Sequence, residues 1–158
     1  MHNEQIMRRA YAVAERVHIK GWVDRFTPDG TFTDMSIGVT YQGPEGPNGL
    51  GQTVAVFAKA FPDMHRELYR FFSMGDVVVV ELALQGTHQG PLPTPMGTLP
   101  ATGKRMDAPC CDVFRIVNGK IQSFHCYPSG TVIFAQLGVL SNIEAAIAAS
   151  STTQGEPA

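Results

Sequence analysis

The sequence predicts an α+β domain in which helices pack on one face of an antiparallel sheet. Three observations lead to this prediction. Apolar residues recur near helical spacing over residues 6–20. A run rich in β-branched residues covers 77–84, and Asn118-Gly119, the strongest short hairpin signal in the chain, separates two further strand-like runs. Helices therefore come first along the chain, and long antiparallel strands follow.

The first half of the chain is predicted to consist of helices joined by turns and a loop. The amphipathic helix over 6–20 extends in pattern through Trp22, Val23 and Phe26. Turn-forming residues then predict a turn at 27–30, which a short strand at 31–34 follows. The Pro and Gly residues of 36–52 predict a loop. A helix is expected at 52–60, and a short helical stretch, capped by Asp63, at 64–72.

The second half is predicted to be mostly β-structure. Its expected elements are a strand at 77–84 that runs on toward residue 88, a Pro-rich loop or lid at 90–103, strands at 105–117 and 120–127, and a final short helix or extended segment at 131–140. We expect residues 1–149 to form a single domain and residues 150–158, which are small and polar, to form a disordered tail.

Composition narrows the class of protein. Hydrophobic residues make up 44% of the chain and charged residues 16%, which is typical of a globular domain. The net charge is −2 and the chain contains no Lys/Arg cluster, so we expect neither a nucleic-acid partner nor a membrane surface. Apolar runs are too short for a bilayer, and the N-terminus lacks the apolar core of a secretion signal. The expected location is the cytoplasm.

The cysteines give no sign of a disulfide framework. There are three of them, Cys110, Cys111 and Cys126, and two are adjacent. The sequence has no CxxC, HExxH or His-x-His spacing that would indicate zinc. We therefore interpret all three as buried, reduced thiols and predict no metal and no cofactor.

The Asn118-Gly119 turn predicts the register of the hairpin around it. A two-residue turn places Val117 opposite Lys120, provided that the pairing contains no bulge. The pairs that step outward are then Ile116 with Ile121, Phe114 with Ser123, Asp112 with His125, and Cys110 with Tyr127. Alternation places these residues on one face, which its isoleucines and Phe114 make apolar.

An aspartate opposite a histidine on an apolar wall suggests acid/base chemistry. Directly opposed side chains lie about 5 Å apart at Cβ, within hydrogen-bonding reach. Asp112 would orient the His125 ring, whose other nitrogen would serve as general acid or base near neutral pH. If Asp112 were buried without that partner, it would itself be the base. The alternative is a purely structural cross-strand pair.

Further polar and apolar residues are candidates for the same pocket. Tyr127 and His88 would donate hydrogen bonds to a developing oxyanion, although His88 could equally lie on the surface where its strand frays and Tyr127 could simply pack. The predicted substrate-binding residues are Asp34, Tyr41, Trp22, Phe26, Phe61, Met64, Phe114 and Met96. For the apolar residues among them, the alternative is a place in the hydrophobic core without contact to a ligand.

Several short motifs together resemble a known family. They are Ala60-Phe61-Pro62-Asp63-Met64-His65, Gly75-Asp76-Val77-Val78, Gly86-Thr87-His88-Gln89-Gly90, Ala101-Thr102-Gly103-Lys104, Asp112-Val113-Phe114-Arg115, Asn118-Gly119-Lys120-Ile121 and Gln136-Leu137-Gly138. In order and spacing they resemble the SnoaL-like polyketide cyclase and ester cyclase group of the nuclear-transport-factor-2-like superfamily. The resemblance covers roughly residues 55 to 140.

The resemblance implies a cone-shaped fold, with about three helices against a strongly curved sheet and a deep pocket at its wide end. It also implies cofactor-free acid/base chemistry on a small carbonyl-bearing molecule, and a dimer. The group typically carries a Trp four residues after the Gly-Lys-Ile motif and a catalytic Asp eight residues after it. In this chain those positions hold His125 and Ser129, so we expect a rearranged Asp112–His125 site.

These observations predict a cofactor-independent lyase or isomerase that cyclises, isomerises or eliminates on a small apolar carbonyl compound. The alternatives are a water-activating hydrolase of the epoxide-hydrolase type, a non-catalytic small-molecule binding protein, and an interaction module that uses only the outer face of the sheet. The outer sheet face is also fairly apolar, at Val77, Val79, Ala83, Cys111 and Val113. We expect two copies of the chain to form a homodimer through it.

Overall fold

A curved, mixed sheet dominates the computed structural model, which describes residues 2–140 and 145–150. Within residues 2–140 the sheet has six strands in the order β2-β1-β8-β7-β4-β3. Strands β1 and β8 are parallel and every other neighbouring pair is antiparallel. The bounds are β1 Phe26–Asp34, β2 Val39–Gln42, β3 His65–Met74, β4 Val77–Thr87, β7 Arg105–Val117 and β8 Lys120–Pro128. A separate hairpin pairs β5 (Leu92–Thr94) with β6 (Gly97–Leu99).

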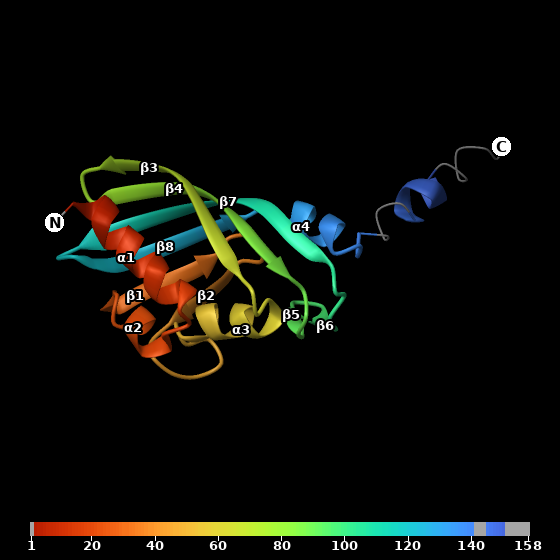
Figure 1. Ribbon diagram of the computed structural model, residues 1–158, viewed down its shortest axis with the longest axis horizontal. Helices are drawn as coiled ribbons and strands as arrows, with labels where there is room; N and C mark the ends of the chain where they lie inside the picture. The colour runs from red at the N-terminus through yellow and green to blue at the C-terminus, as the bar shows by residue number, and fades with distance from the viewer. Residues whose placement is uncertain (1, 141–144, 151–158) are drawn as a thin grey trace.

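Helices α1 (Asn3–Glu15), α2 (Ile19–Val23) and α3 (Gln52–Ala60) lie on one face of this sheet, and α4 (Gly130–Gln136) follows β8 (Figure 1). The buried residues of α1 recur three or four positions apart, as on one helical face: Met7, Ala10, Tyr11, Val13 and Ala14. The helix predicted over 6–20 is divided, because Val17 has φ of 54° and the chain turns there before α2. The curved sheet with helices on one face confirms the predicted fold class.

Several predicted elements have the expected bounds. The helix at 52–60 is α3 and the strand at 105–117 is β7. The strand predicted from residue 77 runs to Thr87 as β4, and the segment after residue 130 begins with α4. Side chains of β7 alternate between buried and more exposed positions along the whole strand. This period of two follows from the pleat of a β-strand. Alternating apolar and polar residues in the sequence therefore predict a strand.

The helical prediction for 64–72 is wrong, because this segment belongs to strand β3. Leu68 pairs with Leu82 and Phe71 with Val80, so β3 forms the edge of the sheet beside the valine-rich β4. Pairing with the apolar strand β4 outweighs the weak local signal from Asp63. Asp63 instead accepts hydrogen bonds from the backbone nitrogen and the hydroxyl of Thr87, at 2.6 and 2.8 Å.

The turn predicted at 27–30 lies inside β1, where the pairing with β8 changes register. Gly30 is required there, because a Cβ at this position would meet the Ile121 carbonyl oxygen at 2.8 Å. The two predicted loops also hold short strands, β2 within 36–52 and the β5–β6 hairpin within 90–103. The Pro and Gly content of these segments hid those strands from sequence analysis.

The hairpin between β7 and β8 contains a bulge close to its turn. Asn118 and Gly119 have φ of 49° and 77°, as a two-residue hairpin turn requires, and the pairs nearest the turn form as predicted. The register then shifts, so that Arg115 pairs with Ser123 instead of Gln122. A one-residue shift exchanges the two faces of a strand. From this point onward, the predicted cross-strand pairs are wrong.

The core lies between the helices and the sheet. Phe61, Val78, Phe114 and Ile121 are fully buried there. No helix in the described part of the chain is both long and apolar enough to cross a bilayer. Of the predicted disordered tail at 150–158, only Ser150 is described, at the end of a short helix over 145–150; residues 151–158 lie outside the described residues.

Candidate functional site

A cavity of about 800 Å³ lies between the sheet and the helices. Its volume is in the range of sites that hold a drug-sized molecule. Most of its wall is apolar, and the large apolar side chains that line it include Trp22, Phe32, Phe57, Phe61, Leu84, Met106 and Phe124. Aromatic rings fix part of this wall, since the Phe32 ring lies 4.3 Å from that of Phe124, centroid to centroid.

Asp112 is the most deeply buried acidic residue at the cavity wall, with 3% of its surface exposed. It lies on the inward face of β7, and Tyr11 reaches it from α1. The Tyr11 hydroxyl donates a 2.6 Å hydrogen bond to Asp112 Oδ2, and the Cys110 thiol donates to Oδ1 at 3.4 Å. Cys126, opposite Asp112 on β8, places its Sγ 3.7 Å from that of Cys110. Four side chains from α1, β7 and β8 thus form one buried polar cluster.

Burial controls the protonation of this cluster. It raises the pKa of Asp112, while the hydrogen bonds from Tyr11, Cys126 and Cys110 act in the opposite direction. Burial and the neighbouring Asp112 carboxylate raise the pKa of Tyr11 well above its ordinary value, so its hydroxyl stays a donor. The hydrogen bond with Cys110, followed by burial, raises the pKa of Cys126 well above that of a free thiol.

A second polar group lies on the cavity wall at β1 and β2. Asp34 accepts hydrogen bonds from the backbone nitrogen and hydroxyl of Ser36, at 2.9 and 2.6 Å. Tyr41 packs edge-on against Phe32, with ring centroids 5.8 Å apart. Burial, and secondarily Asp34, raises the pKa of Tyr41, so its phenol also remains a hydrogen-bond donor. The cavity therefore has two polar regions on an otherwise apolar wall.

The structure brings together part of the predicted site. The predicted residues that line the cavity are Asp112, Asp34, Tyr41, Trp22, Phe61 and Met64. Alternation along β7 was enough to predict that Asp112 points inward. The remaining predicted residues lie elsewhere.

The predicted Asp112–His125 dyad is wrong. Because of the bulge, Asp112 pairs with Cys126, and His125 pairs with Val113 on the outward face of the sheet. Tyr127 pairs with Cys111 on that same face and is 45% exposed. Neither His125 nor Tyr127 is among the cavity-lining residues in the described part of the chain. His125 thus has no access to Asp112.

His88 is fully buried, which contradicts its predicted place at the pocket mouth or on the surface. Its Nδ1 accepts a 3.2 Å hydrogen bond from the Thr102 backbone nitrogen, and its ring lies 5.3 Å from that of Phe61. Nε2 has no hydrogen-bond partner among the described residues. The His88 backbone nitrogen also donates a hydrogen bond to the Lys104 carbonyl oxygen, and the His88 carbonyl oxygen accepts one from the Gly103 nitrogen. His88 therefore joins the end of β4 to the segment before β7, behind the cavity wall.

Three other predicted substrate contacts are absent from the cavity lining of the described chain. Phe26 and Phe114 are buried in the core, 3% and 0% exposed. Met96 is 92% exposed at the turn of the β5–β6 hairpin. Apolar identity alone did not distinguish a core position from a cavity wall or an exposed turn.

Sequence analysis missed Tyr11, Cys110, Cys126 and Arg66 as site residues. Helical spacing from Met7, Ala10 and Ala14 places Tyr11 on the buried face of α1, so the signal was present. Cys110 lies two positions from Asp112 on β7, so alternation places both side chains on the inward face. Cys126 was not predictable, because only the bulge turns it inward.

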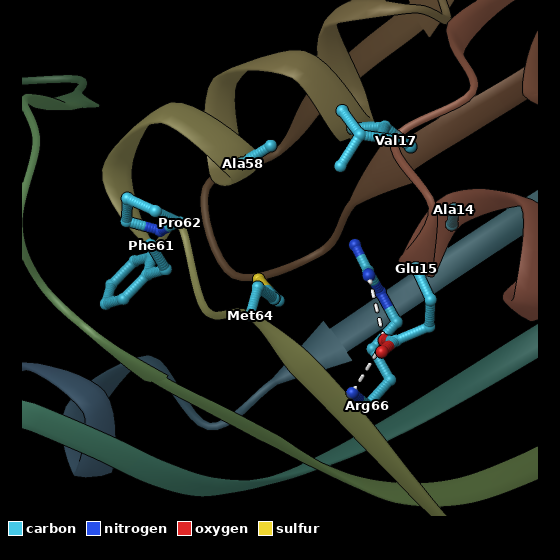
Figure 2. A pocket seen from close by; sticks show the side chains of 9 residues that line it. Ala14, Glu15, Val17, Ala58, Phe61, Pro62, Met64 and Arg66 are labelled. Carbon is cyan, nitrogen blue, oxygen red and sulfur yellow. Dashed lines mark hydrogen bonds and ion pairs between the residues drawn. The ribbon is translucent and has the colours of Figure 1, made fainter.

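Arg66 also lines a much smaller hollow of about 20 Å³ between α1, α3 and the start of β3, with Glu15 and Met64 (Figure 2). Glu15 accepts hydrogen bonds from the Arg66 backbone nitrogen at 2.8 Å and from its guanidinium at 3.3 Å. Arg66 lines the large cavity as well, and its positive charge acts on the Asp112 carboxylate. The ion pair ties the end of α1 to the start of β3.

Solved structures share this architecture. A protein with a ketosteroid isomerase-like fold from Catenulispora acidiphila DSM 44928, in complex with trimethylamine, has a TM-score of 0.70 and 23% sequence identity; the match covers 87% of this chain and 95% of that one. TsrD from Streptomyces laurentii has a TM-score of 0.71 at 21% identity, with 87% and 95% covered. The fold is therefore that of the ketosteroid isomerase-like proteins, built around a cavity.

Sequence comparison shows the family. The model for SnoaL-like polyketide cyclases matches residues 4–137, and the chain belongs to that family. Aklanonic acid methyl ester cyclase DnrD of Streptomyces peucetius is 34% identical over 107 residues, which are 66% of this chain and 71% of that protein. The cyclase DauD of Streptomyces sp. (strain C5) is also 34% identical over 107 residues, covering 66% of this chain and 64% of DauD. The family predicted from the motifs is confirmed.

Proposed function

We propose that this chain is a cofactor-independent cyclase in which Asp112 is the general base. One observation carries the proposal: a buried carboxylate, held by the Tyr11 hydroxyl at 2.6 Å, lies on the wall of an apolar cavity of about 800 Å³. A carboxylate that has lost most of its water removes a proton more readily than an exposed one. The family, whose members are described as polyketide cyclases, supports ring closure as the reaction.

The proposed reaction needs only one base and conserves all atoms. Asp112 removes a proton from a carbon next to a carbonyl group, and the resulting enolate attacks a second carbonyl of the same molecule. A carbon–carbon bond forms and the attacked carbonyl oxygen becomes an alkoxide. The proton held by Asp112 then passes to that alkoxide, so the product is an isomer of the substrate and Asp112 is again ionised.

Tyr11 and Tyr41 have different parts in this proposal. Tyr11 is a positioning residue, because its hydroxyl is already bonded to Asp112 Oδ2 and fixes the carboxylate against the cavity. Tyr41, on the β1–β2 side of the cavity, retains a phenolic proton that can bind a substrate carbonyl oxygen. A donor directed at developing negative charge in a dry site lowers the barrier to reaction.

The cavity and the relatives support one class of substrate. The two curated relatives act on aklanonic acid methyl ester. The cavity has the volume for a drug-sized molecule and few polar side chains on its wall. We therefore place the substrate among apolar esters that carry a second, ketonic carbonyl within reach of the acidic carbon.

Asp112→Asn is the direct test, with aklanonic acid methyl ester as the probe. The variant should lose turnover by about 10²–10⁴-fold, the usual contribution of a general base, with ligand affinity nearly unchanged. His125→Ala is the matched control, because His125 lies on the opposite face of the sheet, and it should retain full activity. Full turnover by Asp112→Asn, or loss of turnover in His125→Ala, would reject the assignment. Tight binding of the ester by the unaltered chain without conversion would instead identify a binding protein.

A further inference from the structure

Three soft or anionic donor atoms converge beside the cavity, on two adjacent strands. Cys110 and Asp112 point inward from β7, and Cys126 points inward from β8 opposite Asp112. The thiol sulfurs and one carboxylate oxygen all lie within 4.8 Å of one another. Cys110 and Asp112 are buried, and Asp112 and Cys126 line the cavity. The bulge in β8 creates this convergence, because without it Cys126 would face outward.

Two of the three donor separations match the edges of a metal coordination tetrahedron, and the third, between Cys126 Sγ and the Asp112 carboxylate, is within 4.8 Å. Zinc–sulfur bonds of about 2.3 Å and zinc–oxygen bonds of about 2.0 Å at tetrahedral angles place two sulfurs about 3.8 Å apart and sulfur and oxygen about 3.5 Å apart. The observed separations are 3.7 Å between the two sulfurs and 3.4 Å between Cys110 Sγ and Asp112 Oδ1. Tyr11 holds Oδ2, and Oδ1 is the oxygen that faces the Cys110 thiol.

We propose that Cys110, Asp112 and Cys126 form a binding site for Zn²⁺ on the cavity wall. Two thiolates and a carboxylate are a ligand set that zinc accepts, and thiolates select against Mg²⁺ and Ca²⁺. Three protein ligands leave the fourth position for water or for a ligand in the cavity. The ion replaces the two thiol protons, which are released to solvent, and the carboxylate binds in its ionised form.

Charge at the site supports a divalent cation. Two thiolates and one carboxylate around Zn²⁺ leave one net negative charge, and the Arg66 guanidinium, which is also paired with Glu15, acts on Asp112 with the opposite sign. The side chain of Arg66 is only 13% exposed, so its field is poorly screened by water. The second carboxylate oxygen keeps its hydrogen bond from Tyr11, which would orient the ligand as outer partners of zinc ligands do.

Metal binding would regulate the site, and this consequence rests on the proposed function of Asp112. A carboxylate bound to Zn²⁺ cannot also take a proton from a substrate. We therefore expect Zn²⁺ to inhibit the cyclase reaction and a chelator to restore it. Binding itself is independent of that reaction, so the two claims are measured separately.

Cobalt titration of the reduced, metal-free full chain is the test. Co²⁺ takes the place of Zn²⁺ and should give a thiolate-to-cobalt charge-transfer band and the visible bands of a tetrahedral ion, saturating at one ion per chain. Added Zn²⁺ should abolish both. Cys126→Ser and Cys110→Ser should each weaken binding by at least about tenfold, a loss that even outer partners of metal ligands produce.

Cys111→Ser is the matched control, since Cys111 neighbours both Cys110 and Asp112 in sequence but faces outward opposite Tyr127. It should leave the cobalt spectrum unchanged. Absence of the charge-transfer band in the unaltered chain overturns the metal site, and so does its loss in Cys111→Ser with retention in Cys126→Ser. If Zn²⁺ binds and turnover is unaffected, the inhibitory consequence is wrong. A chain without any cyclase activity would leave the spectral result valid.

Discussion

At the scale of single residues, the cluster around Asp112 shows how a carboxylate is kept inside a small domain. Burying an ionisable group is costly unless its oxygens find donors. Tyr11 and Cys110 each supply one, to Oδ2 and Oδ1 respectively. Asp112 is thus satisfied and still lies on the cavity wall, where a ligand can reach it.

Tyr11→Phe should lower the free energy of unfolding by about 1.5–3 kcal/mol, the usual worth of a buried hydrogen bond to a charged group. Urea unfolding monitored by circular dichroism measures this change. In turnover assays the same variant should reduce kcat more than it alters KM, because the loss acts through the position of Asp112. Tyr69→Phe is the control: Tyr69 is 60% exposed on β3, and its loss should cost less than about 0.5 kcal/mol. Equal losses in the two variants would contradict the prediction.

At the scale of secondary-structure elements, contacts between α1 and β3 hold the helix over the cavity. Glu15 at the end of α1 binds both Arg66 and His65 at the start of β3. His65 Nε2 also lies 2.8 Å from Glu67 Oε2. The imidazole therefore sits between two carboxylates, and the charged form of the ring is favoured.

His65 should make the stability of the chain depend on pH. The hydrogen bonds to Glu67 and Glu15 raise its pKa above the ordinary 6.5, and burial opposes them only partly. Because the folded state holds the proton more tightly, this stabilisation is fully present below pH 6.5 and is lost as the pH rises through the raised pKa. NMR titration of the His65 ring should show a downward shift of the pKa in Glu67→Gln. Glu45→Gln, in the loop before α3, should leave it unchanged; an unshifted pKa in Glu67→Gln would contradict the assignment.

At the scale of the whole molecule, the sheet has two faces with different surroundings. Helices α1, α2 and α3 cover one face (Figure 1), and the cavity lies between them and the sheet. On the other face, Phe72, Val79 and Val113 are successive cross-strand partners on β3, β4 and β7. Phe72 is 51% exposed. In an isologous dimer this row would pack against its own copy across a two-fold axis, and we propose it as the interface of the homodimer expected from the sequence.

We predict that Val113→Lys converts the proposed dimer to a monomer, because it would bury two like charges at the two-fold interface. Light scattering after size-exclusion chromatography measures the mass of each form, and circular dichroism confirms that the variant is folded. Met96→Lys adds the same charge at an exposed methionine away from the sheet face and should stay dimeric. A monomeric unaltered chain, or a dimeric Val113→Lys, would show that this face does not mediate association.

Local patterns in the sequence were sufficient for most of the fold. Short-range signals predicted these elements: the spacing of Ala10 and Ala14, the valines of β4 and the Asn118-Gly119 turn. Each signal depends only on residues that are close together in the sequence. The same patterns placed Asp112 on the inward face. They failed for β3, whose residues become a strand only because β4 lies beside them.

The sequence by itself therefore determined the class of fold, the family and the inward position of Asp112. Only the tertiary structure decided which side chains surround that aspartate. The physical reason is the single unpaired residue near the β7–β8 turn, which reverses the faces of β8 and exchanges His125 for Cys126. Tyr11 reaches Asp112 across 101 positions of the chain, a contact that packing of α1 against the sheet creates. Local periodicity places Tyr11 on the buried face of α1, but it carries no information about its partner or about the bulge.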